Sequence, residues 1–170
     1  MRITLLAAFM ALMGLSASAQ ANPSGTNDNN LYSLALKASI LQMEKEWGHL
    51  GHSAFEDKIE VPTDYRHMLV LKDPIITDDL PTAFENHSME FVDDQELVDR
   101  YRKLRKSFAV LKIGPIRNQG SVLKIVVSTS WFSYKKHRRQ FDYSDWSDVE
   151  FHYDCGQGAF SISSVKLGGI

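Results

Sequence analysis

Cysteine is nearly absent from this chain, which has one thiol in 170 residues. Cys155 has no internal partner, so the fold has to be stabilised by packing rather than by disulfide bonds. Because free cysteine is commonly a buried apolar group, we interpret this residue as a small, partly buried side chain beside a turn. The alternative is a disulfide between two molecules.

An excess of positive charge is also absent. The chain has 19 Lys and Arg against 21 Asp and Glu, a formal net charge of −2. A mildly acidic domain is a poor candidate for general nucleic-acid binding, because phosphate contacts need clustered cations. The sequence also lacks a glycine-rich phosphate loop, a Gly-x-Ser-x-Gly turn and EF-hand spacing. These absences argue against kinases, serine hydrolases of that type and calcium sensors.

Only one long apolar run is present, and it lies near the start of the sequence. Arg2 precedes an apolar stretch (Ile3 to Leu15), and small residues follow. This order is typical of a secretory signal peptide, and the run is shorter than the about 20 apolar residues of a membrane span. We predict a cleavable signal peptide over residues 1–21, with cleavage after Ala21 rather than Ala19.

The signal peptide predicts a protein that is secreted or periplasmic. The cleavage region has no cysteine, so we do not expect a lipoprotein, and no later segment is apolar enough to cross a bilayer. The remaining chain is the size of one domain with a sizeable core. We divide it into a flexible polar lead-in at residues 22–30 and a single domain at residues 31–170.

Two helices are predicted from apolar spacings of three and four residues. The first begins near Asn30, a good N-cap, and ends at Gly48 or Gly51. Its apolar face comprises Tyr32, Leu36, Ile40, Met43, Trp47 and Leu50. The second runs from about Asp94 to Phe108, with an acidic first turn and a basic last turn that suit the helix dipole. Its stripe comprises Leu97, Val98, Tyr101, Leu104 and Phe108.

Short strands are predicted at residues 65–72 and 87–92, and four longer strands follow the second helix. The longer strands are separated by turn signals at residues 118–120, 135–139 and 156–157. The predicted pairs are Ile113–Ile125 and Leu111–Val127 in the first hairpin, Trp131–Tyr143, Thr129–Asp145, Ile125–Val149 and Leu123–Phe151 in the second, and Phe151–Ile162 and Tyr153–Phe160 in the third.

All three predicted registers place the same apolar residues on one face of the sheet, and a slip of one residue would scatter them. A bulge at Ser163-Ser164 would bring Val165 and Leu167 to this face as well. The predicted face comprises Leu111, Ile113, Leu123, Ile125, Val127, Val149, Phe151, Phe160 and Ile162.

The order of helix, two strands, helix and four long strands resembles the nuclear transport factor 2-like superfamily, which has the cystatin-like α+β roll. The final strands SVLKIVVSTSWFSY, YSDWSDVEFHYDC and AFSISSVKLG carry this resemblance. It implies two helices packed on the concave side of a strongly curved antiparallel sheet, and pairing of two copies through the sheet. Residues 52–63 are weakly patterned where members usually have another short helix. Because members include enzymes, binding modules and immunity proteins, the resemblance implies no single chemistry.

A candidate pocket follows from the inward parity of polar residues in such a roll. His67 on the first strand and Asp145 on the third long strand would form an acid/base pair suited to dehydration or isomerisation next to a carbonyl. The alternative is a wet, turn-like Asp145 and a His67 that only bonds a neighbour. The candidate pocket residues are Tyr65, His67, Thr129, Trp131, Tyr143 and Asp145.

Surface residues offer a second kind of site. A basic hairpin tip and a basic end of the second helix (residues 100–106) could each bind an acidic partner. A charged tip also protects a sheet edge against aggregation, which is the simpler interpretation. The candidate contact residues are Lys135, Lys136, Arg138, Arg139 and the outward-facing Trp146.

We expect no metal and no cofactor. His49 and His52 have helical spacing for a metal, but glycines interrupt that helix and no further ligand completes the set. Because the predicted interior is mostly aliphatic, the sequence favours a binding or interaction module for an unknown small molecule or protein. A small lyase or isomerase, and an inhibitor or immunity-type protein, are the alternatives.

Overall fold

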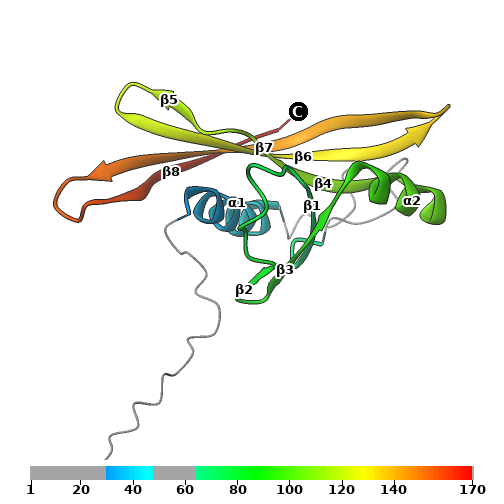
Figure 1. Cartoon of the computed structure of the whole chain (residues 1–170), viewed down its shortest axis with the longest axis horizontal. Coiled ribbons are helices and arrows are strands. Elements are labelled where there is room, and N and C mark those ends of the chain that lie inside the picture. The colour runs from blue at the N-terminus through cyan, green and yellow to red at the C-terminus, as the bar shows by residue number, and fades with distance from the viewer. Residues whose placement is uncertain (1–29, 48–63, 170) are drawn as a thin grey trace, which may run out of the picture.

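The computed structural model describes residues 30–47 and 64–169, which form two helices and eight strands (Figure 1). In chain order they are α1 (Leu31–Trp47), β1 (His67–Leu71), β2 (Ala83–Phe84), β3 (His87–Val92), α2 (Asp94–Leu104), β4 (Phe108–Ile113), β5 (Arg117–Gln119), β6 (Val122–Lys135), β7 (Arg138–Asp154) and β8 (Ala159–Gly169). No helix of these residues has the length and apolar character to cross a membrane.

The predicted starts of both helices agree with the capping contacts. The Asn30 side chain accepts a hydrogen bond from the Tyr32 backbone at 3.0 Å, as expected for an N-cap. Asp93 and Glu96 form a capping box at the start of α2. The prediction that this helix continues to Phe108 is wrong, because Arg105 takes a left-handed φ of 58° and ends it at Leu104.

Several predictions fall outside the described residues. They are the signal peptide at residues 1–21, the lead-in at residues 22–29, the stop of the first helix at Gly48 or Gly51, the unassigned residues 52–63, and the pair His49 and His52.

The sheet is mixed, so the predicted antiparallel sheet is wrong. Its strands lie in the order β2-β3-β1-β4-β6-β7-β8, and β5 also pairs with β6. Strand β1 runs parallel to both of its neighbours, β3 and β4, whereas the other pairs are antiparallel. Between β1 and β3 the chain returns through residues 72–82 and the strand β2, which is antiparallel to β3, so β1 and β3 point the same way. Helix α2 then carries the chain from the end of β3 back to the start of β4, and such a helical crossover makes β3 and β4 parallel.

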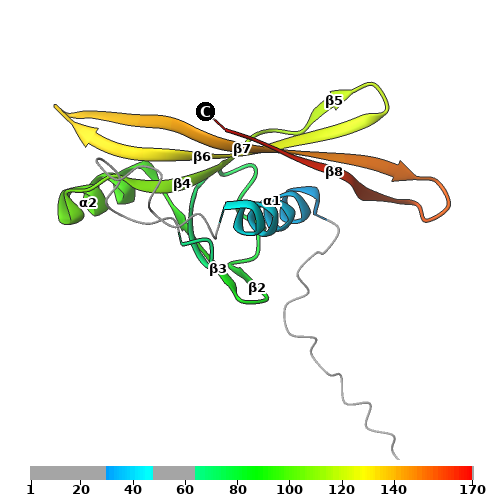
Figure 2. The ribbon, with the colours of Figure 1, turned by 180° about the vertical axis from the view of Figure 1, so that it is seen from behind.

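The two helices lie on opposite faces of the sheet, which also contradicts the predicted roll with both helices on its concave side. Side chains alternate between faces along a strand. In β4, Val110 packs with α2, whereas the next residue, Leu111, packs with α1, and both are fully buried. Figures 1 and 2 show α1 and α2 on either side of β1 and β3. The described residues therefore form two hydrophobic clusters, one with α1 and one with α2, separated by the sheet.

The α1 cluster contains most of the predicted apolar face. Its buried members from the strands include Leu111, Ile113, Ile125, Val127, Val149 and Phe151, and Leu123, Val165 and Leu167 pack against them half-buried. Phe160 and Ile162 share this face but are each 38% exposed. The β7–β8 hairpin extends beyond the end of α1, so no helix covers these two side chains (Figure 1).

The registers of the two later hairpins confirm most of the predicted pairs. Thr129–Asp145, Ile125–Val149, Leu123–Phe151, Phe151–Ile162 and Tyr153–Phe160 all occur. The predicted bulge is present, because Ser163 lies between the paired residues Ile162 and Ser164. The third connection is a loop over residues 155–158 rather than a two-residue turn, but it is centred at the predicted place.

Three predicted pairs are wrong. Ile113 pairs with Val127 instead of Ile125, and Leu111 pairs with Thr129, because β5 forms its own short hairpin with β6 and separates β4 from the turn. Trp131 pairs with Asp142 instead of Tyr143. The register shifts between Thr129 and Ser130, which is the effect of a β-bulge in the facing strand.

Candidate functional site

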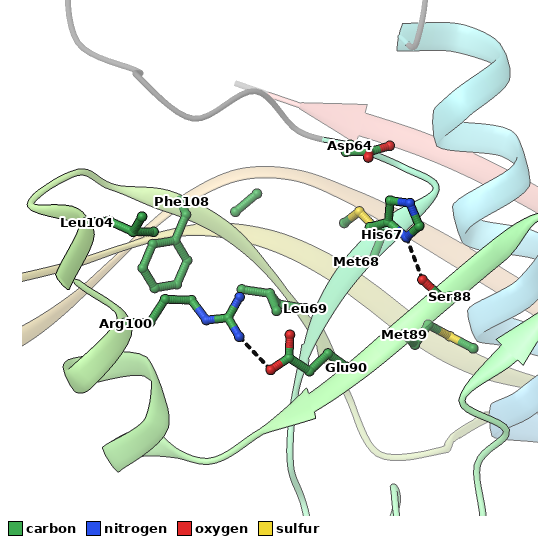
Figure 3. Close-up of a pocket in the computed structure, with 11 residues that line it drawn as sticks. Asp64, His67, Met68, Leu69, Ser88, Met89, Glu90, Arg100, Leu104 and Phe108 are labelled. Atoms are coloured by element: carbon green, nitrogen blue, oxygen red, sulfur yellow. Dashed lines mark hydrogen bonds and ion pairs between the residues drawn. The ribbon is translucent and has the colours of Figure 1, made fainter. Parts of the chain in front are cut away.

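A cavity of about 370 Å³ lies where the parallel strands β1 and β4 separate, and we call it the β1–β4 cavity. The two strands make one register pair, Val70 with Leu111, and diverge toward their N-terminal ends. The end of α2 and the start of β4 form one wall of the cavity, and β1 and β3 form the other (Figure 3). Its lining residues are Asp64, His67, Met68, Leu69, Ser88, Met89, Glu90, Arg100, Leu104, Phe108 and Ala109.

The cavity lining has a large apolar part. Met68, Met89 and Phe108 are buried, so their positions are fixed by the packing of the two clusters. Leu104 is the last residue of α2 and is 42% exposed, which places it at the mouth. The more accessible apolar part of the lining comes from Leu69, half-buried on the face that carries α2, and from Leu104.

A histidine and a serine supply the first polar group in the cavity. The Nδ1 atom of His67 lies 2.6 Å from the Ser88 hydroxyl oxygen (Figure 3). Ser88 in turn donates its proton to the Arg66 carbonyl at 3.3 Å. With its proton used there, the hydroxyl can accept a hydrogen bond from Nδ1. This contact orients the imidazole, and in the neutral ring it favours the tautomer with the proton on Nδ1, which leaves Nε2 as an acceptor.

An ion pair between β3 and α2 supplies the second polar group. An Arg100 guanidinium nitrogen donates to a Glu90 carboxylate oxygen at 2.5 Å across the cavity (Figure 3). Asp64, at the opposite end, accepts a hydrogen bond from the Arg66 backbone at 3.0 Å. The cavity therefore combines an apolar lining with hydrogen-bonding groups at separate places on its wall.

The structure does not bring His67 and Asp145 together. Met68 and Val70 pack in the α1 cluster, so His67 points to the opposite face of β1. Asp145 pairs with Thr129, on the α1 side, and lines a second, more open cavity of about 440 Å³ with Trp47. Its carboxylate accepts a hydrogen bond from Ser144 at 2.7 Å. The predicted acid/base pair is therefore not assembled.

The other predicted pocket residues are distributed over three environments. Thr129 is buried, and its hydroxyl donates to the Met43 sulfur at 3.8 Å, so it has a packing role. Trp131 is half-buried opposite Ala109 on β4. Tyr143 is 62% exposed. Tyr65 is half-buried, and its burial, together with the nearby negative charge of Asp145, raises its pKa to about 12.

The pKa of Tyr65 gives a pH prediction. The folded chain keeps the phenol proton between about pH 10 and 12, whereas the unfolded chain releases it near pH 10. The half-buried, protonated phenol of Tyr65 therefore adds to the free energy of unfolding. This addition is fully present below about pH 10 and is lost as the pH rises toward about 12. An ultraviolet absorbance titration should therefore show one late-forming tyrosinate, absent in Tyr65→Phe. In Asp145→Asn it should form at lower pH, but still above the ordinary value, because burial is the larger cause. Ionisation of all tyrosines near pH 10 would contradict this.

Sequence reasoning missed Ser88, Glu90 and Arg100. Ser88 and Glu90 alternate with Met89 and Phe91 along β3, and this alternation predicts that the two polar side chains lie on one face of the strand. Their position beside His67 depends on the parallel pairing of β1 with β3, in which His67 faces Ser88. No turn connects these strands directly, so no local signal in the sequence gives this register.

The predicted surface residues are exposed, with one qualification for Trp146. The indole of Trp146 lies over Gly168 of β8, so close that a Cβ atom at that glycine would fall 2.4 Å from the ring. It is 38% exposed, because one side of the ring is used in this packing.

The prediction that Cys155 is partly buried is wrong, since its residue is exposed in the β7–β8 loop. A homodimer through the sheet stays a prediction.

Within residues 30–47 and 64–169 no group of three or more His, Cys, Asp or Glu side chains is placed to hold a metal ion.

No family model, no curated protein sequence and no solved structure matches the chain. The family resemblance that rests on element order therefore stays a prediction, and the antiparallel roll that it implied is wrong.

Proposed function

We propose that the protein is a binding module that acts outside the cytoplasm and holds a small amphipathic molecule in the β1–β4 cavity. The observation that carries this proposal is the opening between two parallel strands, which leaves about 370 Å³ between apolar walls. Ligand sites in proteins commonly have volumes of about 300–1,000 Å³ and combine a mainly apolar lining with a few oriented polar groups. The location outside the cytoplasm rests on the signal-like sequence of residues 1–21.

The lining also restricts the kind of ligand. An apolar body of the ligand would contact Leu69, Leu104 and Phe108. A hydroxyl or amide N–H of the ligand could donate to the Nε2 atom of a neutral His67, because Ser88 occupies its Nδ1 atom. Because Glu90 and Arg100 neutralise each other, Asp64 is the one carboxylate of the lining without an ion pair to a described residue. We assign no catalytic role, since His67 and Asp145 lie in different cavities.

Filling the cavity tests this proposal. Anilinonaphthalene sulfonate, an amphipathic dye whose fluorescence rises in apolar surroundings, is a suitable probe. We expect the wild-type protein to bind one dye molecule in this cavity and Leu104→Trp to weaken that binding at least about tenfold, which corresponds to about 1.4 kcal/mol. Leu104 is at the mouth and 42% exposed, so the larger side chain should block the cavity while the fold is retained. Far-ultraviolet circular dichroism checks the fold.

The matched control is the exposed apolar pair Phe160 and Ile162, which could also attract the dye. Phe160→Ser with Ile162→Ser should leave the binding unchanged. Ala109→Leu, which fills the cavity from the start of β4, should repeat the effect of Leu104→Trp. If the dye binds both cavity variants as tightly as the wild type, or only the control variant loses binding, the β1–β4 cavity is not a ligand site.

A further inference from the structure

The β6–β7 hairpin carries a basic tip, and helix α2 supports the hairpin from one face. The hairpin extends past the rest of the sheet to a narrow tip, and α2 lies beside it (Figures 1 and 2). Two contacts hold them together: the Arg102 guanidinium lies 5.3 Å from the centre of the Tyr134 ring, and Arg139 forms an ion pair with Asp94. Because Tyr134 and Arg139 therefore face α2, their neighbours Lys135 and Arg138 project from the opposite face of the hairpin.

The charge of this surface is not balanced locally. Its carboxylates are already engaged, Asp94 with Arg139 and Asp99 with Arg102. Three cations at the tip form no ion pair with any described residue, and all are exposed. We call these three the basic hairpin surface: Lys135, Lys136 and Arg138. The whole chain has a formal net charge of −2, so this is a local concentration of positive charge on a mildly acidic protein.

The turn at the hairpin tip has positive φ angles at two residues that are neither glycine nor asparagine, which makes its backbone strained. Lys136 and His137 are its two central residues, and both have positive φ, 51° and 60°. A two-residue hairpin with positive φ at both positions favours Asn-Gly, because side chains with a Cβ atom are disfavoured there. Strain that persists at an exposed turn, where a better sequence is available, is more common at functional positions.

We propose that the basic hairpin surface docks into an acidic cleft of a partner protein. The occupant has to be anionic because the three unpaired cations are the dominant feature of the tip. An acidic protein fits better than a lipid surface, because proteins that lie on membranes combine basic residues with inserted apolar ones. Within residues 134–140 no large apolar side chain is exposed. A narrow, protruding hairpin also suits a cleft more than a flat surface. Such a contact is the kind that an inhibitor or immunity-type protein makes.

Charge reversal at the tip tests the proposal independently of the cavity. The probe is a glutamate-rich peptide, and the readout is its affinity for the full chain at low and physiological salt. Lys136→Glu with Arg138→Glu should weaken binding at least about tenfold, since two attractions become repulsions. The control, Lys45→Glu with Arg117→Glu, changes the net charge equally at exposed positions elsewhere and should change the affinity less than about twofold. Far-ultraviolet circular dichroism and urea unfolding of both variants check that they are folded.

Three outcomes would overturn the proposal. The first is that the wild-type chain does not bind the glutamate-rich peptide at low salt. The second is an equal loss of affinity in the tip variant and the control, which would show attraction by overall charge alone. The third is that phosphatidylglycerol vesicles or single-stranded DNA bind in a tip-dependent manner while the peptide does not. That result would assign the surface to lipid or to nucleic acid instead.

Discussion

Replacing Phe132 by alanine is expected to lower the free energy of unfolding by about 3–5 kcal/mol, the range for truncation of a fully buried aromatic side chain. Phe132 is completely buried at the centre of the α2 cluster. Its ring contacts Phe108 and Phe141 at centroid distances of 5.5 and 5.1 Å, and the edge of Tyr101 at 6.4 Å. Truncation would leave a cavity among three aromatic rings and β4, which cannot close without moving α2. Urea unfolding followed by circular dichroism measures the change.

Two comparison variants make this a test of the architecture. Leu111→Ala, on the other face of the sheet, should cost about 2–5 kcal/mol. Phe160→Ala, at a position that is 38% exposed, should cost less than about 1 kcal/mol. In a sheet with one solvated face, only one of the two buried positions would be sensitive. A small effect of Phe132→Ala beside a large effect of Leu111→Ala would therefore contradict the packing of α2 on the second face.

Removing the carboxylate of Glu44 is the second change for which we expect a large effect. Glu44, on α1, accepts a hydrogen bond from the Nε2 atom of His87 on β3 at 2.9 Å. The His87 side chain is 6% exposed, and its Nδ1 atom has no partner among the described residues. In Glu44→Ala both ring nitrogens would be buried without a partner, which should cost about 1–3 kcal/mol. Chemical denaturation measures this cost.

A double-mutant cycle separates this interaction from other effects of Glu44. His87→Phe removes both ring nitrogens and keeps a flat ring that can stack on Phe84, as the imidazole does at a centroid distance of 4.9 Å. In that background Glu44→Ala should cost less than about 0.5 kcal/mol. Asp99→Ala, which breaks the exposed pair with Arg102, provides the control and should also cost less than about 0.5 kcal/mol. If Glu44→Ala costs as much in the His87→Phe background as in the wild type, the lost stability comes from helix α1 and not from the contact with His87.

The parts of the fold that the sequence predicts are those joined by short turns. In the β6–β7 and β7–β8 hairpins the turn sets the register and the alternation of apolar residues confirms it, so pairs such as Ile125–Val149 follow from local signals. The bulge at Ser163 also follows, because without it Ser164 would replace Val165 on the apolar face. The shift beside Thr129 carries no such signal, since polar residues lie on both sides of it.

The parallel half of the sheet is not predictable in this way. Pairs such as Val70–Leu111 join segments that are distant in the chain, and no turn relates them. The apolar stripe of α2, with Leu97 and Val98, shows that the helix packs on something, but it does not show which face receives it. The assumption of one apolar face therefore placed both helices on the same side.

The candidate site shares this limit. His67 was found because it interrupts an apolar strand, which is a signal in a single segment. Its neighbours Ser88 and Arg100 come from β3 and α2, and their approach depends on the parallel arrangement. Asp145 was paired correctly with Thr129, but it faces the other side of the sheet from His67.

The adjacent residues Val110 and Leu111 have a consequence for how the molecule loses its structure. Each is a member of a different hydrophobic cluster, and a single rigid peptide unit connects them. A displacement of β4 that opens one cluster to water must disturb the other at the same time. The N-terminal helix and the crossover helix, although they never share a face, are for this reason coupled in their resistance to denaturation.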